Sequence, residues 1–291
     1  MGQEAFFWTI LSTLLGGIQL FFQKVVAEEK RPSALNGLFM YSLSGIAAFV
    51  ILFTFYKLPS AWMLIAAFGL GAGALHGLGN FIRLEALGYI DSVIYFPINK
   101  VLGPLLVVFG GVMFYAEQLT AREYIGIALS LTVPLLLISA AEHHRQKDLR
   151  RGLIFVVLST FFTSASVLLT KQGIIYDNDL FFIMGMSQIA GAISSGAILL
   201  KQRGATSSAV FHITKRDIEL GLIAGVLGFF SWFTLLKALS LGLISLVYVI
   251  HAHYILIPII LSVWWYKDHI NFRKAIAVVV SFLAITILYS P

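Results

Sequence analysis

Two ionisable side chains lie deep inside long apolar runs of the sequence, where a charge is costly and usually functional. Lys100 comes eight residues after the start of the run 92–115, and His251 comes eight residues after the start of the run 243–266. At a helical rise of about 1.5 Å per residue, both lie roughly 12 Å from a membrane edge, too deep to reach water easily. A central cation prefers a carboxylate or phosphate partner, so Lys100 predicts a binding site for an anionic group.

Seven further residues inside apolar runs are candidates to line the same site as Lys100 and His251. They are Gln19, His76, Asn80, Ser166, Trp232, Tyr248 and Tyr254. Tyr248 and Tyr254 share the helix face of His251, and their rings suit an apolar or ring-bearing part of a substrate. Two alternatives stay open. Lys100 can be a structural lysine bonded to carbonyls that nearby prolines free, and the small polar residues can simply pack helices together.

The acidic residues lie at or beyond the ends of the apolar runs, and none lies in the interior of one. Binding a lone cation, or coupling it to protons through a buried carboxylate, normally needs such a group, so a cationic substrate is disfavoured. The substrate classes that fit are amino acids, organic acids and phosphorylated solutes. Because an imidazole titrates at about pH 6.5, His251 makes protons a candidate coupling ion.

The sequence carries no pattern typical of an enzyme or a metal site. His251 and His253 diverge on a helix, cysteine is absent, and no His-Glu-x-x-His pattern occurs. Glycine-rich phosphate loops, nucleophile elbows and paired catalytic carboxylates are also missing. We therefore predict no enzymatic activity, no cofactor and no metal.

The composition requires a membrane protein. Of the 291 residues, 59% are hydrophobic and 12% are charged, whereas soluble domains carry about 25% charged residues. The mean hydropathy is +0.90, and a helix needs roughly 20 apolar residues to cross a bilayer. The ten predicted spans are 5–23, 34–56, 61–82, 92–115, 121–140, 152–171, 180–200, 218–239, 243–266 and 272–290.

The second half of the sequence repeats the first. When residues 69–87 are placed over residues 221–239, nine positions are identical. Five spans per half is an odd number, so the two halves must cross the membrane in opposite senses as inverted repeats. That architecture is associated with alternating access around a site near the midplane, where Lys100 and its repeat partner His251 should meet. The predicted repeats are residues 1–145 and 146–291.

Several segments resemble the EamA-like members of the drug/metabolite transporter superfamily. They are Gly16-Gly17 with Lys24, the matching Lys171, and the stretch from Ala86-Leu87-Gly88-Tyr89 through Pro97 and Pro104 to Tyr115-Ala116-Glu117-Gln118-Leu119-Thr120. The second copy of the last motif departs from the pattern and reads Trp265-Tyr266-Lys267-Asp268-His269-Ile270. The resemblance covers nearly the whole chain and implies a ten-helix transporter that exports amino acids or other small metabolites. Plastid relatives exchange phosphorylated sugars, and smaller relatives expel cationic drugs.

These observations predict an all-α, multi-pass protein of the plasma or inner membrane that acts as a secondary transporter by alternating access. Its expected partners are a small-molecule substrate, membrane lipids and protons, with no nucleic acid, and its expected state is a monomer or homodimer. The alternatives are an exporter of neutral or hydrophobic compounds and a lipid-handling protein.

The distribution of positive charge predicts the orientation. Of the 20 Lys and Arg residues, 14 fall in loops on one side of the predicted spans and three on the other. The positive-inside rule then places both termini outside the cytoplasm. EamA-like relatives are usually described with cytoplasmic termini, so the sequence departs from that expectation.

Overall fold

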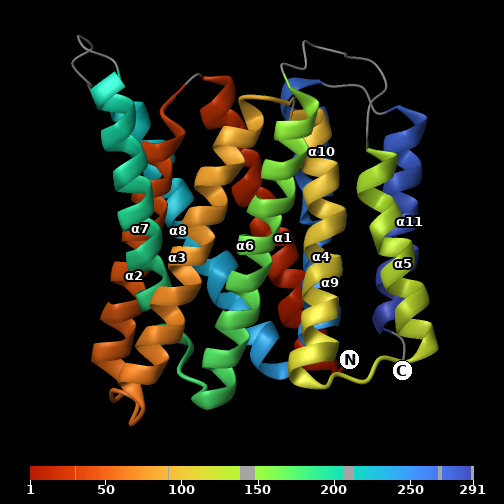
Figure 1. The fold of residues 1–291 in the computed structure, drawn as a ribbon, viewed down its shortest axis with the longest axis horizontal. Helices are drawn as coiled ribbons and strands as arrows, with labels where there is room; N and C mark the ends of the chain where they lie inside the picture. Colours follow the sequence, from red (N-terminus) through yellow and green to blue (C-terminus); the bar gives the residue numbers. More distant parts are fainter. Residues whose placement is uncertain (30, 91, 138–147, 206–212, 268–270, 290–291) are drawn as a thin grey trace.

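The computed structural model describes residues 1–29, 31–90, 92–137, 148–205, 213–267 and 271–289. Within these ranges the protein is a bundle of long helices without strands (Figure 1). The elements are α1 (Gln3–Glu28), α2 (Ser33–Phe55), α3 (Trp62–Leu87), α4 (Ser92–Tyr115), α5 (Ala121–Leu136), α6 (Leu149–Tyr176), α7 (Leu180–Ala205), α8 (Lys215–Leu241), α9 (Ile244–His251), the 3₁₀ turn η1 (Ala252–Ile255), α10 (Leu256–Tyr266) and α11 (Phe272–Tyr289).

The helices cross the bundle in alternating directions, and α9, η1 and α10 together make a single crossing (Figure 1). Nine of the described segments are long and apolar enough to span a membrane. The tenth crossing is α5, which has 16 described residues. The all-α fold with ten crossings is therefore as predicted. The two chain ends lie at one edge of the bundle, which we name the terminal edge. The opposite edge, which carries the α1–α2 turn and the start of α8, is the distal edge.

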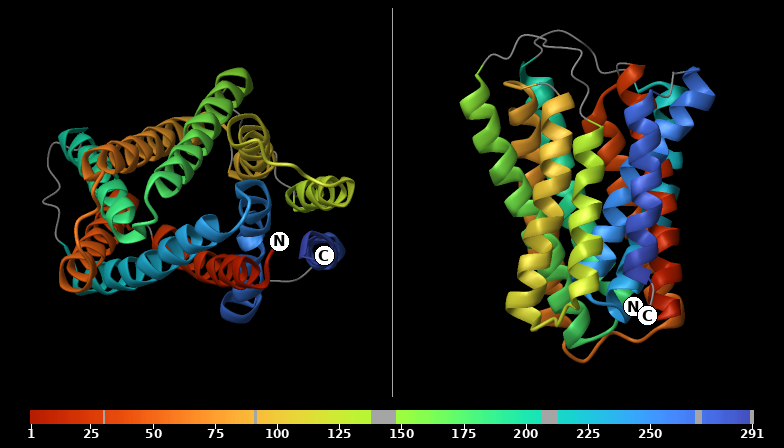
Figure 2. Two further views of the ribbon diagram at one scale, coloured as in Figure 1. Left: turned by 90° about the horizontal axis from the view of Figure 1, so that it is seen from below. Right: turned by 90° about the vertical axis from the view of Figure 1, so that its right-hand side faces the viewer.

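The main helix contacts pair a helix of the first half with a helix of the second. α1 packs along α8, α3 along α6, α2 along α7, and α5 along α11. In the repeat, α1 corresponds to α6 and α8 corresponds to α3. The pair α1–α8 is therefore equivalent to the pair α6–α3, and the packing follows the repeat found in the sequence. The α5–α11 pair stands at one side of the bundle (Figure 2).

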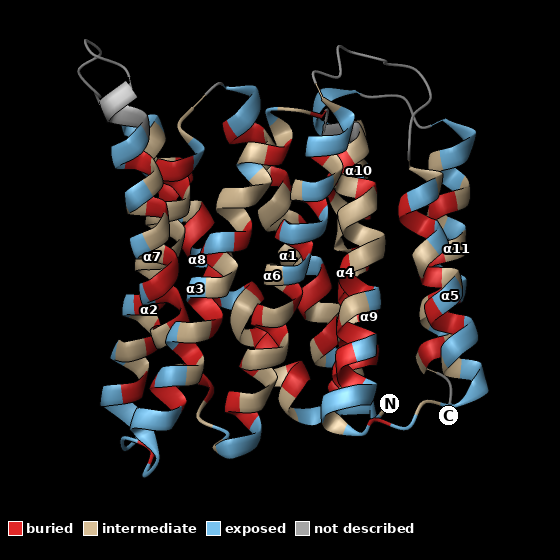
Figure 3. Ribbon diagram, in the orientation of Figure 1, coloured by how far each residue is buried: buried red, intermediate tan, exposed pale blue. Residues whose placement is uncertain are grey.

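Exposed residues lie around the outside of the bundle (Figure 3), and many large apolar residues are among them. Phe53, Phe109 and Phe282 are 64%, 62% and 69% exposed, as contact with lipid requires. Small residues allow close approach inside the bundle, because a Cβ on Gly73 of α3 would lie 2.2 Å from the carbonyl oxygen of Ser187 in α7. The chain is an integral, multi-pass membrane protein.

The run predicted as the span 243–266 is interrupted at its centre. α9 ends at His251, and the 3₁₀ turn η1 separates it from α10. Pro258 has no N–H to donate to the carbonyl of Tyr254 four residues earlier, which accounts for the interruption. The counterpart in the first half, α4, contains Pro97 and Pro104 but stays helical throughout. A 3₁₀ segment in the middle of a helix often marks a hinge.

Candidate functional site

The structure brings Lys100 of α4 and His251 of α9 to the same small cavity. Lys100 Nζ donates a hydrogen bond to the hydroxyl of Tyr254 in η1 and lies 4.2 Å from the centre of the Tyr254 ring. The centres of the His251 and Tyr254 rings are 5.0 Å apart. His251 Nδ1 lies 3.1 Å from Ser12 Oγ of α1. The second half of the chain therefore supplies aromatic partners to the cation of the first half.

This cavity, which we name the central cavity, lies between α4, α6, α9 and η1 and has a volume of about 20 Å³. It is lined by Asn99, Lys100, Gly103, Pro104, Thr163, Tyr248, His251, Ala252 and Tyr254. A volume of this size holds about one water molecule, so a metabolite could enter only after the helices move apart. None of these lining residues is acidic, and Lys100 is the one cationic residue among them apart from the titratable His251.

Three other predicted residues meet in a second cluster with Tyr41 of α2. The ring of His76 lies 6.5 Å from the ring of Trp232 and 6.4 Å from that of Tyr41. Asn80 Nδ2 donates to the Tyr41 hydroxyl at 3.2 Å. Trp232 Nε1 is buried and has no hydrogen-bond partner among the described residues. The cluster thus joins α2, α3 and α8 but is separate from the lining of the central cavity.

The remaining predicted residues divide between the central cavity and helix packing. Tyr248 lines the central cavity, with its ring 6.5 Å from that of His251. Gln19 Nε2 contacts the sulfur of Met40 at 2.7 Å, outside the cavity lining. Ser166 is 2% exposed and donates to the carbonyl of Ala72 in α3 at 2.7 Å. Ser166 therefore connects α6 to α3, which is the packing role given above as the alternative.

Comparison with known families shows what kind of protein contains this cavity. The model of the EamA-like transporter family matches residues 150–290. Over this range the chain belongs to the EamA-like transporter family. The protein is a membrane transporter of small solutes, and its family is one of transporters rather than enzymes.

The other comparisons bear on the fold. A solved structure titled "Crystal structure of protein" is similar to this chain, with a TM-score of 0.72 and 16% identity over 96% of each chain. At that identity the similarity establishes the fold alone. No curated protein sequence matches the chain. The EamA match lies in the second half, so the assignment of the first half rests on its resemblance to the second.

Two charged residues of this transporter, one buried and one partly buried, have contacts that the sequence did not predict. Glu117 lies beyond the end of α4, as predicted, but it is 8% exposed and accepts hydrogen bonds from Ile244 N (2.5 Å) and Ser245 N (3.1 Å) at the start of α9. Lys171 Nζ of α6 donates to the carbonyls of Leu239 (2.5 Å) and Gly242 (3.0 Å).

Together these two side chains hold the turn between α8 and α9 at the terminal edge. The internal repeat could have drawn attention to both residues, because Lys171 aligns with Lys24 and Glu117 aligns with Asp268. Asp268 lies outside the described residues. Lys24 Nζ donates to Ser262 Oγ of α10 at 2.9 Å, whereas Lys171 contacts the end of α8, so the two repeat-related lysines make different contacts.

The chemistry available in this EamA-like transporter is that of binding. The central cavity offers an ammonium group, an imidazole, hydroxyls and aromatic rings. Among the described residues, no three His, Asp or Glu side chains are grouped closely enough to hold a metal ion.

Proposed function

We propose that this transporter moves a small anionic solute, with Lys100 as the cationic anchor in the central cavity. The observation that carries the proposal is the lining itself, in which Lys100 meets aromatic and hydroxyl groups and no acidic residue. An ammonium at that depth lacks a counter-charge, and a carboxylate or phosphate would supply one. Amino acids, organic acids and phosphorylated metabolites all carry such a group.

The proposed mechanism is alternating access between two inverted repeats, residues 1–145 and 146–291. Three observations support it. The helix pairs α1–α8 and α3–α6 exchange when the halves are exchanged. Ala116 and Lys267, which occupy equivalent repeat positions, are the described non-glycine residues with positive φ, at 51° and 57°. The central cavity is also too small for a metabolite, as expected for a state closed to both sides.

A second candidate is transport of neutral or hydrophobic compounds. The observation that favours it is the hydrogen bond from Lys100 to Tyr254, because this contact gives the ammonium a partner without any anion. In that case Lys100 is structural, and the aromatic residues make the binding surface.

A thermal-shift screen with matched pairs of solutes would separate these candidates, because a ligand that binds the folded protein raises its apparent stability. Each pair consists of a carboxylate or phosphate and its neutral amide or alcohol analogue, tested at constant ionic strength on the purified transporter. We expect the anionic members to raise the melting temperature of the wild type, and Lys100→Met to abolish the shift. Equal shifts from the neutral analogues, retained in Lys100→Met, would contradict the proposal.

A further inference from the structure

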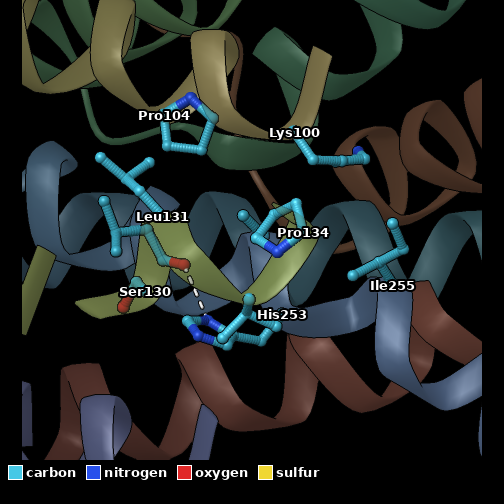
Figure 4. A pocket seen from close by; sticks show the side chains of 10 residues that line it. Lys100, Pro104, Ser130, Leu131, Pro134, His253 and Ile255 are labelled. Atoms are coloured by element: carbon cyan, nitrogen blue, oxygen red, sulfur yellow. Dashed lines mark hydrogen bonds between the residues drawn. The ribbon is translucent and has the colours of Figure 1, made fainter. Parts of the chain in front are cut away.

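Lys100 also borders a second small cavity, between α4, α5 and η1, which has a volume of about 10 Å³. That volume is close to the minimum for a single water molecule. The ammonium group of Lys100 points away from His253, another lining residue of this cavity (Figure 4). This cavity therefore offers a solute at Lys100 no further charged group. The second cation that acts on the lining of the central cavity is on α3 instead.

That cation is Arg83, a partly buried residue just beyond the predicted span 61–82 but within α3, four residues before the helix ends at Leu87. α3 ends and α4 begins at the distal edge (Figure 1). At about 1.5 Å per residue, Arg83 lies roughly 6 Å from the distal end of its helix and Lys100 roughly 12 Å from the start of α4. The two cations are therefore in the same half of the bundle, with Arg83 nearer the distal edge.

The position of Arg83 in the repeat is one that faces the bundle interior. Its equivalent in the second half is Leu235, which is 3% exposed. The positive charge of Arg83 acts on side chains of four elements: Tyr41 of α2, His76 of α3, Tyr95 of α4 and Tyr254 of η1. Because these four elements surround the interior of the bundle, the guanidinium group faces inward rather than toward lipid.

Arg83 and Lys100 share two of these neighbours. The charges of both cations act on His76 and on Tyr254. Tyr254 lines the central cavity, whereas Arg83 is absent from that lining. His76 belongs to the separate cluster around Trp232. The two cations are therefore close neighbours at different positions, so that one small anionic group cannot contact both.

Neither cation has an acidic partner among the residues that the structure describes. Lys100 donates to the hydroxyl of Tyr254, and Arg83 makes no hydrogen bond or ion pair within the described part of the chain. Glu85, two residues after Arg83 on α3, pairs instead with Lys201 of α7 at 3.5 Å. Two neighbouring positive charges without a counter-charge are satisfied by carboxylate or phosphate groups.

We propose that Arg83 is a second anion-binding residue, and that Arg83 and Lys100 together select solutes with two anionic groups at separate positions, such as dicarboxylates. The inference rests on the proposed function, in which Lys100 holds the first anionic group. The second group binds the guanidinium, whose planar fork matches the two oxygens of a carboxylate. A dianion neutralises both cations, whereas a monoanion leaves one of them without a counter-charge.

Matched ligands that differ in charge test this selection on the full-length transporter in lipid nanodiscs. Succinate carries two carboxylates, succinamate has an amide in place of one of them, and succinamide has amides in place of both. Calorimetry at neutral pH and constant ionic strength gives each dissociation constant for the wild type, Arg83→Gln, Arg83→Lys and Arg150→Gln. Arg150 is exposed at the start of α6, so Arg150→Gln controls for the loss of one positive charge at the distal edge.

We expect the wild type to bind succinate roughly ten- to a hundred-fold more tightly than succinamate, because a second charge-assisted hydrogen bond forms. Succinamate should in turn bind more tightly than succinamide. Arg83→Gln should bind succinate as weakly as succinamate, with its affinity for succinamate unchanged. Arg150→Gln should keep the wild-type ratio, and Arg83→Lys, which retains the charge, should keep most of it.

Equal wild-type affinities for succinate and succinamate, both above that for succinamide, would overturn the role of Arg83 and leave Lys100 as the anchor. The role of Arg83 would also be overturned if Arg83→Gln kept the wild-type ratio or weakened both anions equally. No preference for either anion over succinamide, or no binding of any of the three, would contradict the proposed function as well. The wild-type ratio decides the first point by itself, even if Arg83→Gln does not fold.

Discussion

The two edges of the bundle are closed by different kinds of electrostatic contact. At the terminal edge, buried Glu117 and partly buried Lys171 bond directly to backbone groups of the α8–α9 region. At the distal edge, Arg216 pairs with Glu29 at 2.8 Å and Arg31 pairs with Asp217 at 2.9 Å.

One distal pair is well exposed, since the side chains of Glu29 and Arg216 are 31% and 44% exposed, whereas Asp217 of the other pair is 8% exposed. Exposed ion pairs contribute about 0–1 kcal/mol each, whereas hydrogen bonds to buried charged groups contribute about 1.5–3 kcal/mol. The comparison indicates that the terminal edge is held more firmly. We therefore expect the distal edge to open more readily during a transport cycle, and the predictions below test that difference.

The largest expected effect concerns which edge faces the cytoplasm. Most of the basic loop residues lie on the distal side, so we expect that edge to be cytoplasmic and both chain ends to be outside. A C-terminal alkaline-phosphatase fusion should be active, and a C-terminal GFP fusion should be dark. Fluorescent GFP together with an inactive phosphatase would reverse the orientation.

Glu117→Gln should destabilise the terminal edge. The variant loses the negative charge that accepts from Ile244 N and Ser245 N. Because both amides start a buried helix, we expect a loss on the order of 2 kcal/mol in the free energy of unfolding. Denaturant unfolding in detergent measures it, with Glu4→Gln, an exposed acid, as the control. An unchanged free energy in Glu117→Gln would show that the terminal edge does not depend on this carboxylate.

Lys171→Met should have a smaller but measurable effect. It removes two charged donors from the carbonyls of Leu239 and Gly242, while the methionine keeps most of the volume. Part of the loss is offset because a desolvated charge disappears, so we expect about 1–2 kcal/mol. The same unfolding assay applies, with the exposed Lys57→Met as control. Equal free energies of unfolding for Lys171→Met and Lys57→Met would contradict the role given to Lys171.

Glu29→Gln should have the smallest effect, and that effect should depend on pH. Arg216 and then Arg31, through hydrogen bonds, lower the pKa of Glu29 below its usual value of 4.5. A carboxyl with a lowered folded-state pKa stabilises the protein above its unfolded pKa and loses that contribution as the pH falls through the folded value. The melting temperatures of the wild type and Glu29→Gln should therefore differ slightly at pH 7 and converge in acid or high salt. A difference that does not shrink as the pH is lowered would exclude this ion pair as its cause.

The sequence was sufficient to predict the ten crossings and the meeting of Lys100 with His251. Both follow from long-range regularities, namely the length of apolar runs and the repeat that makes residues 100 and 251 equivalent. The burial of Glu117 could not be predicted, because it depends on how the α4–α5 turn packs against α9.

The same limit applies to individual side-chain contacts. Ser166 and Thr163 lie three residues apart on α6, yet Ser166 bonds to α3 and Thr163 lines the central cavity. The spacing of residues along a helix predicts which side chains share a face, but the neighbouring helix determines what that face contacts.

The central claim is that Lys100 anchors an anion, and the dissociation constant of an anionic ligand tests it most directly. The ligand is the best anionic solute from the thermal-shift screen, titrated by calorimetry into the wild type and Lys100→Met. Loss of a charge-assisted hydrogen bond of about 1.5–3 kcal/mol predicts binding weaker by roughly ten- to a hundred-fold. The ligand-free variant should be as stable as the wild type or more so, because a buried charge is gone. Unchanged affinity in Lys100→Met, together with a less stable ligand-free protein, would show that Lys100 is structural and contradict the account.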